Sequence, residues 1–238
     1  MTERSVLPSS TVVYSMLRTL VRGILRLIVR VHAEGMENIP RDESLLLCIN
    51  HLHLFDPPVV MAFMPQTVSV MVASKYAPLH NPIGWILRLV DVVFVNRGEV
   101  DRQALKGVLE RLKAGRTVGV APEGTRSRTG MLQPGKEGAA YIALKSGVRV
   151  LPVAIWGVEQ ILPALTRLRR AEVNIRFGEP FGLEVDPSLT RGAQLEQGTR
   201  QIMLALARML PPAYRGVYAA AVAGEEPSAS AADQPTPA

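Results

Sequence analysis

Residues 44–57 combine an apolar run, a polar loop and a helix start: Ser44-Leu45-Leu46-Leu47-Cys48-Ile49-Asn50-His51-Leu52-His53-Leu54-Phe55-Asp56-Pro57. A continuous apolar run of this length is typical of a strand buried on both faces. Aspartate followed by proline favours a helix start, because Asp caps the first turn and Pro is pre-organised for its first position. The stretch therefore predicts a strand, loop and helix unit in which His51 and Asp56 bracket the loop.

Outward from this unit, short apolar runs alternate with helical patterns. We expect strands near residues 44–49, 68–73, 92–95, 117–121, 149–155 and 172–177. We expect helices near residues 57–64, 82–89, 101–114, 138–146 and 190–209. This alternation predicts an α/β fold, a mixed central sheet flanked by helices.

Composition sets further limits on the protein. A chain of 238 residues that is 47% hydrophobic is long enough for one sizeable core. The single Cys48 excludes a disulfide framework and a multi-cysteine metal site, and it fits a reducing, cytoplasmic compartment. The net charge is +6, and residues 222–238 hold three acidic residues and no Lys or Arg, so the remainder carries +9. Such an excess predicts an anionic partner.

Nucleic acid and anionic lipid both fit that charge. Single-strand binders need aromatic stacking platforms, but only 5% of this chain is aromatic and no basic-aromatic interleaving occurs. We therefore expect an anionic membrane surface and no nucleic acid as the partner. A tail over residues 216–238, rich in Ala, Pro, Ser and Glu, is expected to be disordered.

The N-terminal segment, residues 1–34, is expected to be an amphipathic membrane-surface helix that precedes the domain at residues 35–215. Over residues 11–32, arginines recur at every fourth position: Arg18, Arg22, Arg26 and Arg30. This charge density excludes a spanning helix, and no signal-peptide pattern is present. Such a helix suits the headgroup layer, with its arginines on lipid phosphates. The alternative is an ordinary helix whose apolar face packs on the domain and whose arginines are solvated.

The pair His51 and Asp56 is the first candidate site. Loops at the carboxyl ends of strands are where α/β sheets place ligands. An imidazole oriented by a carboxylate can take a proton from an alcohol at neutral pH, as transfer to a hydroxyl requires. The alternative is an Asp56 that only caps the helix beside an ordinary loop histidine.

The second candidate site is Ala121-Pro122-Glu123-Gly124-Thr125-Arg126-Ser127, which follows the predicted strand at 117–121. A glycine followed by Thr and Arg offers backbone N–H groups, a hydroxyl and a guanidinium, which together suit a phosphate monoester. Arg97 ends another predicted strand. Both features could instead be solvated turn residues.

Four ordered blocks together resemble the family of 1-acylglycerol-3-phosphate acyltransferases: Asn50-His51 through Asp56 (an HxxxxD block), Gly84-Trp85 through Phe94-Val95-Asn96-Arg97, Pro122-Glu123-Gly124-Thr125-Arg126-Ser127, and Val150-Leu151-Pro152-Val153. The resemblance covers roughly residues 35 to 180. The sequence departs from it at three positions, with His53 where many relatives carry Ser, Asn96 where Asp is common, and Ala121 where an aromatic residue often stands. These departures leave the catalytic pair in place and concern the acceptor.

The resemblance implies that the protein transfers an acyl group from acyl-CoA or acyl carrier protein to lysophosphatidic acid, forming phosphatidic acid at the cytoplasmic face of a membrane. It implies that His51 is the general base and Asp56 its orienting partner. The implied phosphate-site residues are Arg97, Glu123, Gly124, Thr125 and Arg126. Neither a metal nor a bound cofactor is expected. Alternatives are an acyltransferase acting on glycerol 3-phosphate or another lysolipid, a hydrolase, and a catalytically silent membrane-binding protein.

Overall fold

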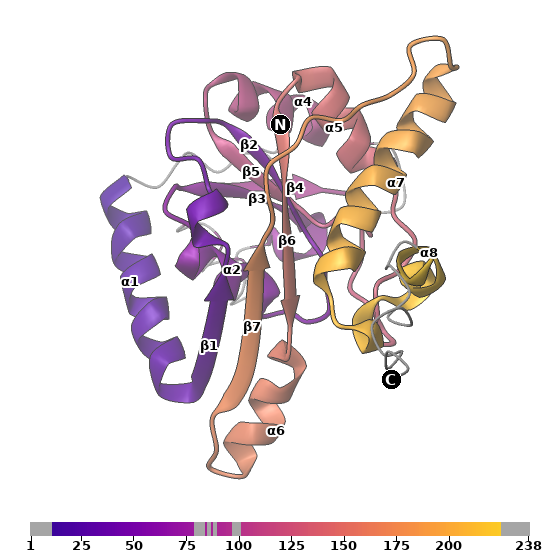
Figure 1. The fold of residues 1–238 in the computed structure, drawn as a ribbon. Helices are drawn as coiled ribbons and strands as arrows, with labels where there is room; N and C mark the ends of the chain where they lie inside the picture. The colour runs from indigo at the N-terminus through magenta and orange to yellow at the C-terminus, as the bar shows by residue number, and fades with distance from the viewer. Residues whose placement is uncertain (1–10, 79–83, 85–86, 88–89, 97–100, 225–238) are drawn as a thin grey trace, which may run out of the picture.

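The computed structural model describes residues 11–78, 84, 87, 90–96 and 101–224 (Figure 1). Within these ranges one seven-stranded sheet has the order β1-β7-β6-β2-β5-β3-β4. Only the β6 and β7 pair is antiparallel, so the sheet is mixed as predicted. The strands are β1 Val29–Glu34, β2 Leu45–Ile49, β3 Val68–Ala73, β4 Val92–Val95, β5 Thr117–Val120, β6 Arg149–Trp156 and β7 Ala171–Phe177.

Helices cover both faces of this sheet (Figure 1). Those in the described residues are α1 Thr11–Ile28, α2 Asp56–Phe63, α4 Arg102–Lys113, α5 Gly138–Ser146, α6 Ile161–Thr166, α7 Arg191–Met209 and α8 Ala219–Ala223. Alternate residues of β2 point to opposite faces: Leu45, Leu47 and Ile49 pack with α1 and α2, whereas Leu46 and Cys48 pack with α4, α5 and α7. Burial on both faces is the physical reason for the continuous apolar run.

The directions of the strands determine which of their ends lie together. Strand β2 is parallel to both β5 and β6, and β5 is parallel to β3, which in turn is parallel to β4. The carboxyl ends of β2, β3, β4 and β5 therefore meet at one edge. Residues that follow these strands share that edge, which is where parallel sheets place ligands.

The N-terminal helix differs from the prediction in two ways. It ends at Ile28, and residues 29–34 form β1, which pairs with β7 inside the domain's own sheet. Its arginines are also not uniformly directed outward: the Arg18 Nη1 atom donates to the carbonyl oxygens of Met64 at 2.8 Å and Pro65 at 2.9 Å. The guanidinium of Arg22 lies 5.2 Å from the centre of the Phe63 ring.

Helix α1 has two opposite apolar faces. One face, with Tyr14 and Leu25, packs on the domain. The opposite face exposes large apolar side chains: Met16, Leu20, Ile24 and Leu27. No helix in the described part of the chain has the length and hydropathy needed to span a bilayer.

The C-terminal boundary was predicted wrongly over residues 216–224. This stretch forms a 3₁₀ turn, Gly216–Tyr218, and helix α8, and Val222 is buried. The prediction failed because its order comes from distant contacts: the Gly135 amide donates to the Tyr218 Oη atom at 3.0 Å. The remaining tail, residues 225–238, and most of the helix expected at 82–89 lie outside the described residues.

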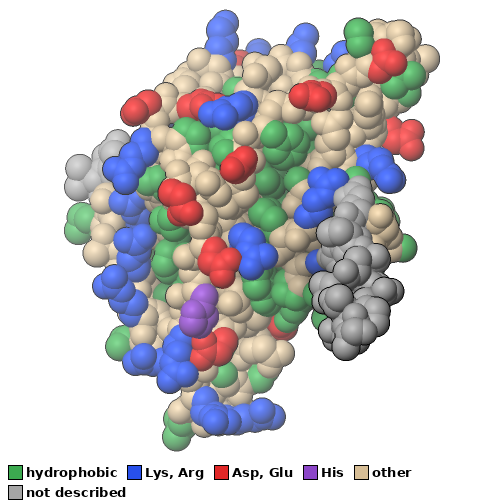
Figure 2. Space-filling model, viewed as in Figure 1, with side chains coloured by type: hydrophobic (Ala, Val, Ile, Leu, Met, Phe, Trp, Pro, Cys, Tyr) green, Lys and Arg blue, Asp and Glu red, His purple; other side chains and the backbone are tan. Residues whose placement is uncertain are grey.

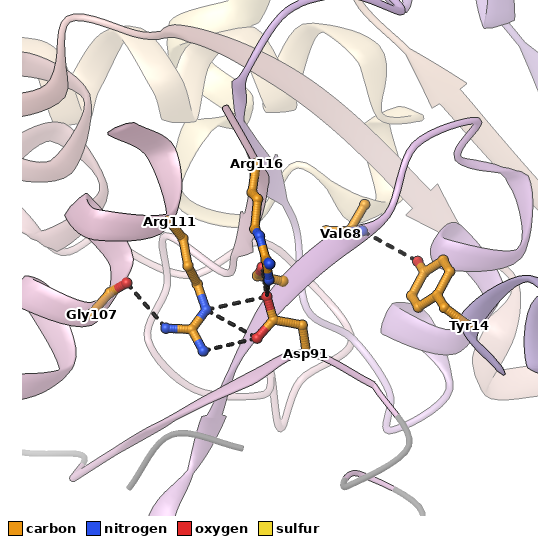
Figure 3. Close-up of polar contacts among 7 residues, drawn as sticks. Tyr14, Val68, Asp91, Gly107, Arg111 and Arg116 are labelled. Carbon is orange, nitrogen blue, oxygen red and sulfur yellow. Dashed lines mark hydrogen bonds and ion pairs between the residues drawn. The ribbon is translucent and has the colours of Figure 1, made fainter. Parts of the chain in front are cut away.

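A buried ion-pair cluster ties together the amino-terminal ends of three strands (Figure 3). Asp91 accepts hydrogen bonds from Arg111 on α4, from Arg116 before β5, and from the Ser69 hydroxyl on β3. Burial alone would raise the pKa of Asp91, but the hydrogen bonds from Arg111 and Ser69 outweigh it, so the pKa is lowered. The cluster stabilises the amino-terminal ends of these strands, and the candidate site lies at their carboxyl ends.

Candidate active site

The loop after β2 brings His51 and Asp56 into direct contact. The His51 Nδ1 atom lies 3.0 Å from Asp56 Oδ2, and the same oxygen accepts from the His53 amide at 2.6 Å. Asp56 is fully buried and is the first residue of α2, whose N-cap is Phe55. Its carboxylate therefore faces the loop and does not cap the helix. Because the carboxylate accepts this bond, the imidazole proton lies on Nδ1, which leaves a lone pair on Nε2.

The backbone of His51 is held by the second sequence block. The His51 amide donates to Glu123 Oε1 at 2.8 Å, and its carbonyl accepts from the Ser127 amide at 2.7 Å. The preceding Asn50 side chain exchanges two 2.8 Å hydrogen bonds with the backbone of Ile155 on β6. Three strands thus contribute to the position of one imidazole.

Glu123 is buried, and both of its carboxylate oxygens are occupied. Its Oε2 atom accepts from the Gln133 amide at 2.9 Å, and Oε1 accepts from His51. Burial raises the pKa of Glu123 from its ordinary value of 4.5 to about 7; the two N–H donors partly oppose this rise, and the Asp56 carboxylate adds to it. Both oxygens of Glu123 thus hold backbone amides, including that of His51, whereas the family resemblance implies a contact with the acceptor's phosphate.

The turn after Glu123 presents the other predicted residues to solvent. Gly124 adopts a φ of +71°, a backbone conformation that favours glycine; a β-carbon there would lie 2.9 Å from Lys136 Cδ, a contact that the flexible lysine side chain can relieve. Thr125 and Arg126 are exposed. The sequence also assigned Arg97 to this site, and that residue lies outside the described residues.

A cavity of about 370 Å³ opens beside His51. Helix α1 and helix α2 form one wall of this cavity, and strands β2, β3 and β5 form the other. Its apolar lining includes Tyr14, Leu17, Val21, Leu47, Ile49, Phe55, Val60, Met61, Val70 and Val72. Its basic lining residues are Arg18, Lys75 and Arg126. The site thus combines a hydrogen-bonded imidazole, an apolar pocket and positive charge.

Lys75 was not predicted from the sequence. It lies two residues after the end of β3, and its Nζ atom lies 5.1 Å from the centre of the Tyr76 ring, which also lines the cavity. The neighbouring Ser74 hydroxyl donates to Asn96 Oδ1 at 2.6 Å, joining the ends of β3 and β4. The sequence did contain evidence for Lys75. It follows the carboxyl end of a predicted strand, and the same criterion selected His51 and Arg126.

Comparison with known proteins places this arrangement in a family. A family model described as Acyltransferase matches residues 30–156, which span β1 through β6 and contain the pair, the Glu123 turn and Lys75. The chain belongs to this acyltransferase family. Members that match include a 1-acyl-sn-glycerol-3-phosphate acyltransferase of Borreliella burgdorferi, 29% identical over 147 residues, covering 60% of this chain and 58% of that protein.

Two further acyltransferase relatives resemble the chain over more of its length. A lyso-ornithine lipid O-acyltransferase of Pseudomonas aeruginosa is 30% identical over 196 residues, covering 75% of this chain and 72% of that protein. The crystal structure of the 1-acyl-sn-glycerophosphate acyltransferase PlsC from Thermotoga maritima superposes with a TM-score of 0.60 at 27% identity, covering 82% of this chain and 79% of that one. The chain spans about half the length of the first curated relatives it matches.

Proposed function

We propose that the protein transfers a fatty acyl group from acyl-CoA or acyl carrier protein to 1-acyl-sn-glycerol 3-phosphate. The observation that carries the proposal is the His51 and Asp56 pair at an apolar cavity that also contains Lys75 and Arg126. The names of the relatives support the same reaction class. An apolar pocket suits an acyl chain, and the two cations suit a phosphate.

The chemistry follows from the position of the imidazole. The His51 Nε2 atom takes the proton of the acceptor's free glycerol hydroxyl while that oxygen forms a bond to the thioester carbonyl carbon. Asp56 stabilises the imidazolium through the 3.0 Å contact with Nδ1. The carbon–sulfur bond then breaks, and the imidazolium returns the proton to the leaving thiolate. The resting histidine is regenerated, and no covalent acyl-enzyme forms.

The acceptor's phosphate is assigned to Arg126 and Lys75, with Arg97 as a further candidate. Gly124 and Thr125 contribute the turn that presents Arg126. Holding the phosphate fixes the hydroxyl near Nε2, and such positioning contributes several kcal/mol to lowering a barrier. Glu123 acts through the His51 backbone and does not contact the substrate.

The enzyme is proposed to work on the cytoplasmic face of a membrane, where its thioester donors occur. The exposed apolar face of α1, with Met16, Leu20, Ile24 and Leu27, supports a helix that lies in the bilayer interface. Of the predicted arginines on α1, Arg18 and Arg22 are only partly exposed, so the apolar residues supply much of its outer surface. Arg26 is exposed beside them and is available to a lipid phosphate.

A second candidate acceptor is a lysolipid with an ornithine headgroup. It is favoured by the Pseudomonas aeruginosa relative, of which this chain covers 72%. Two cations beside the catalytic pair favour the phosphate acceptor. The two proposals predict different products from the same protein.

Mass spectrometry of the products formed from each acceptor with mixed acyl thioesters tests the proposal. We expect phosphatidic acid from the wild-type protein and none from His51→Ala, whose thermal unfolding midpoint should match that of the wild type. Free fatty acid without a new ester would identify a hydrolase. Acylation of the ornithine acceptor alone would transfer the proposal to the second candidate. Absence of thiol release with every acceptor would overturn both.

A further inference from the structure

The turn between α6 and β7 has an unusual residue at its tip. Helix α6 ends in a Schellman motif: the Arg169 amide donates to the Ala164 carbonyl at 2.9 Å, and the Leu168 amide donates to the Leu165 carbonyl at 3.0 Å. Leu168 occupies the position where such motifs favour glycine, with a φ of +53°. It is the only residue other than glycine with a positive φ in the part of the chain that the structure describes.

Leu168 is also almost fully exposed, at 97% of its surface. A leucine in the left-handed region costs free energy that glycine would avoid, and an exposed leucine gains nothing by burial. The folded protein on its own therefore derives no stability from this side chain. A contact outside the protein would account for both features.

The charges next to Leu168 in the chain are basic. Arg167, Arg169 and Arg170 flank it and are exposed. The nearest acidic residue along the chain, Glu172, is paired with Arg30 and His32. In Figure 2 the basic side chains run along α1 and continue onto the lower end of the molecule, where this turn lies. A leucine surrounded by arginines combines an apolar tip with a surface that attracts anions.

The turn is joined to the exposed face of α1. The Arg170 Nε atom donates to the Leu27 carbonyl oxygen at 3.0 Å, at the C-terminal end of α1. Leu27 itself is 70% exposed, and the outer face continues through Ile24, Leu20 and Met16. This hydrogen bond therefore holds the turn against the end of α1 at which the exposed apolar face begins.

We propose that the α6–β7 turn is a second membrane-contacting element, which inserts Leu168 into a bilayer while its arginines bind anionic lipid headgroups. The occupant is a lipid surface and not a protein, because one protruding leucine within basic side chains offers far less apolar area than a stable protein interface needs. Together with α1, the turn gives the protein two contact points and so fixes its orientation on the membrane. This inference rests on the proposed function only in that the enzyme acts at a lipid surface.

Vesicle co-sedimentation of the full chain, without substrate, tests the proposal. Vesicles of phosphatidylcholine and phosphatidylglycerol in equal parts are compared with vesicles of phosphatidylcholine alone. Burying a leucine side chain changes a partition coefficient by about tenfold or more, so Leu168→Gly should weaken binding to the mixed vesicles by about tenfold. Arg169→Gln should weaken it about fivefold on mixed vesicles and leave binding to phosphatidylcholine unchanged.

Matched controls separate this effect from unfolding or a general loss of charge. Leu189→Gly removes another exposed leucine, and Arg200→Gln removes an arginine of α7; neither should alter binding. Leu168→Gly should keep or raise the thermal unfolding midpoint, since glycine suits this backbone, and Leu168→Asn gives a second variant that tolerates it. Unchanged binding of both Leu168 variants to mixed vesicles would overturn the proposal.

The outcome is independent of the proposed reaction. A wild-type protein that binds vesicles through Leu168 but forms no phosphatidic acid would remove the proposed function and keep this inference. If the protein forms phosphatidic acid at the full rate but the Leu168 variants bind vesicles as well as the wild type does, the proposed function stands and this inference is wrong.

Discussion

The substitution Glu123→Gln separates the charge of this buried carboxyl from its shape. Glu123 is 1% exposed, and its carboxyl accepts hydrogen bonds from the backbone amides of His51 and Gln133. Glutamine has the same size but carries an amide nitrogen that cannot accept a hydrogen bond. One of the two amides therefore loses its partner in the variant, which costs about 1–3 kcal/mol at every pH.

The pH dependence of the wild type comes from the raised pKa of Glu123. Between its ordinary value of 4.5 and the folded value of about 7, the folded protein holds a proton that the unfolded chain has released. Stability from this group is therefore fully present below pH 4.5 and is lost as pH rises through 7. The difference between the two pKa values corresponds to about 3 kcal/mol. The variant lacks this dependence, so its free energy of unfolding should rise relative to that of the wild type by about 2.5 kcal/mol between pH 5 and pH 8.

Urea unfolding of both proteins at pH values from 5 to 8 measures the difference. Glu110→Gln is the matched control, since the Glu110 side chain on α4 is 64% exposed, and its difference from the wild type should not vary with pH. A constant difference between Glu123→Gln and the wild type over this range would refute the reasoning. It would mean that Glu123 ionises near its ordinary pKa and that burial does not control it.

Three further substitutions test the proposed acceptor site and the sheet. Arg126→Gln and Lys75→Gln should each raise KM for lysophosphatidic acid by about tenfold while changing kcat less, because each removes a charge-assisted contact worth about 1.5–3 kcal/mol to a phosphate; equal losses with an uncharged lysolipid acceptor would contradict this role. Asp91→Asn should lower the free energy of unfolding by about 3–5 kcal/mol, because it leaves the largely buried Arg111 without its ionic partner. Urea unfolding measures that loss, and a variant as stable as the wild type would contradict it.

Most of the sheet could be predicted because its strands are short apolar runs. The prediction succeeded for β3 and β4 at every residue, since burial on both faces requires continuous apolar sequence. It failed for β1, Val29–Glu34. Arg30 continues the four-residue spacing of α1, so the helical pattern concealed the alternation of Val29, Val31 and Ala33. The change from helix to strand is imposed by pairing with β7, which lies about 140 residues further along the chain.

The proximity of His51 and Asp56 could be expected from their spacing, because a strand-to-helix loop brings its two ends together. The contact of Glu123 with the His51 backbone could not be expected from the sequence. Because Glu123 is next to Gly124 and near Arg126, the sequence pattern assigns it to the same ligand site. In the fold its carboxylate instead points inward and accepts a hydrogen bond from the His51 amide. Likewise the sequence pattern gave no sign that Arg18 would reach the carbonyls of Met64 and Pro65, because the position of α1 on α2 is a tertiary property.

The position of His51 depends on residues near the C-terminal end of the described chain. Glu123 holds the His51 amide with one oxygen and the Gln133 amide with the other. The neighbouring Leu132 amide donates to the Tyr214 carbonyl at 2.9 Å. Gly216 then passes so close that a β-carbon would lie 2.0 Å from the Leu132 carbonyl oxygen.

Residues 214–218 thus hold the segment that carries Gln133, and that segment holds the buried carboxyl. Composition alone assigns residues 216–218 of this stretch to a disordered tail, yet the stretch supports the His51 loop from about 160 residues further along the chain. No local motif contains such a dependence. Its physical basis is that a buried carboxyl needs partners for both oxygens, and the fold supplies the second from a loop that the C-terminus fixes.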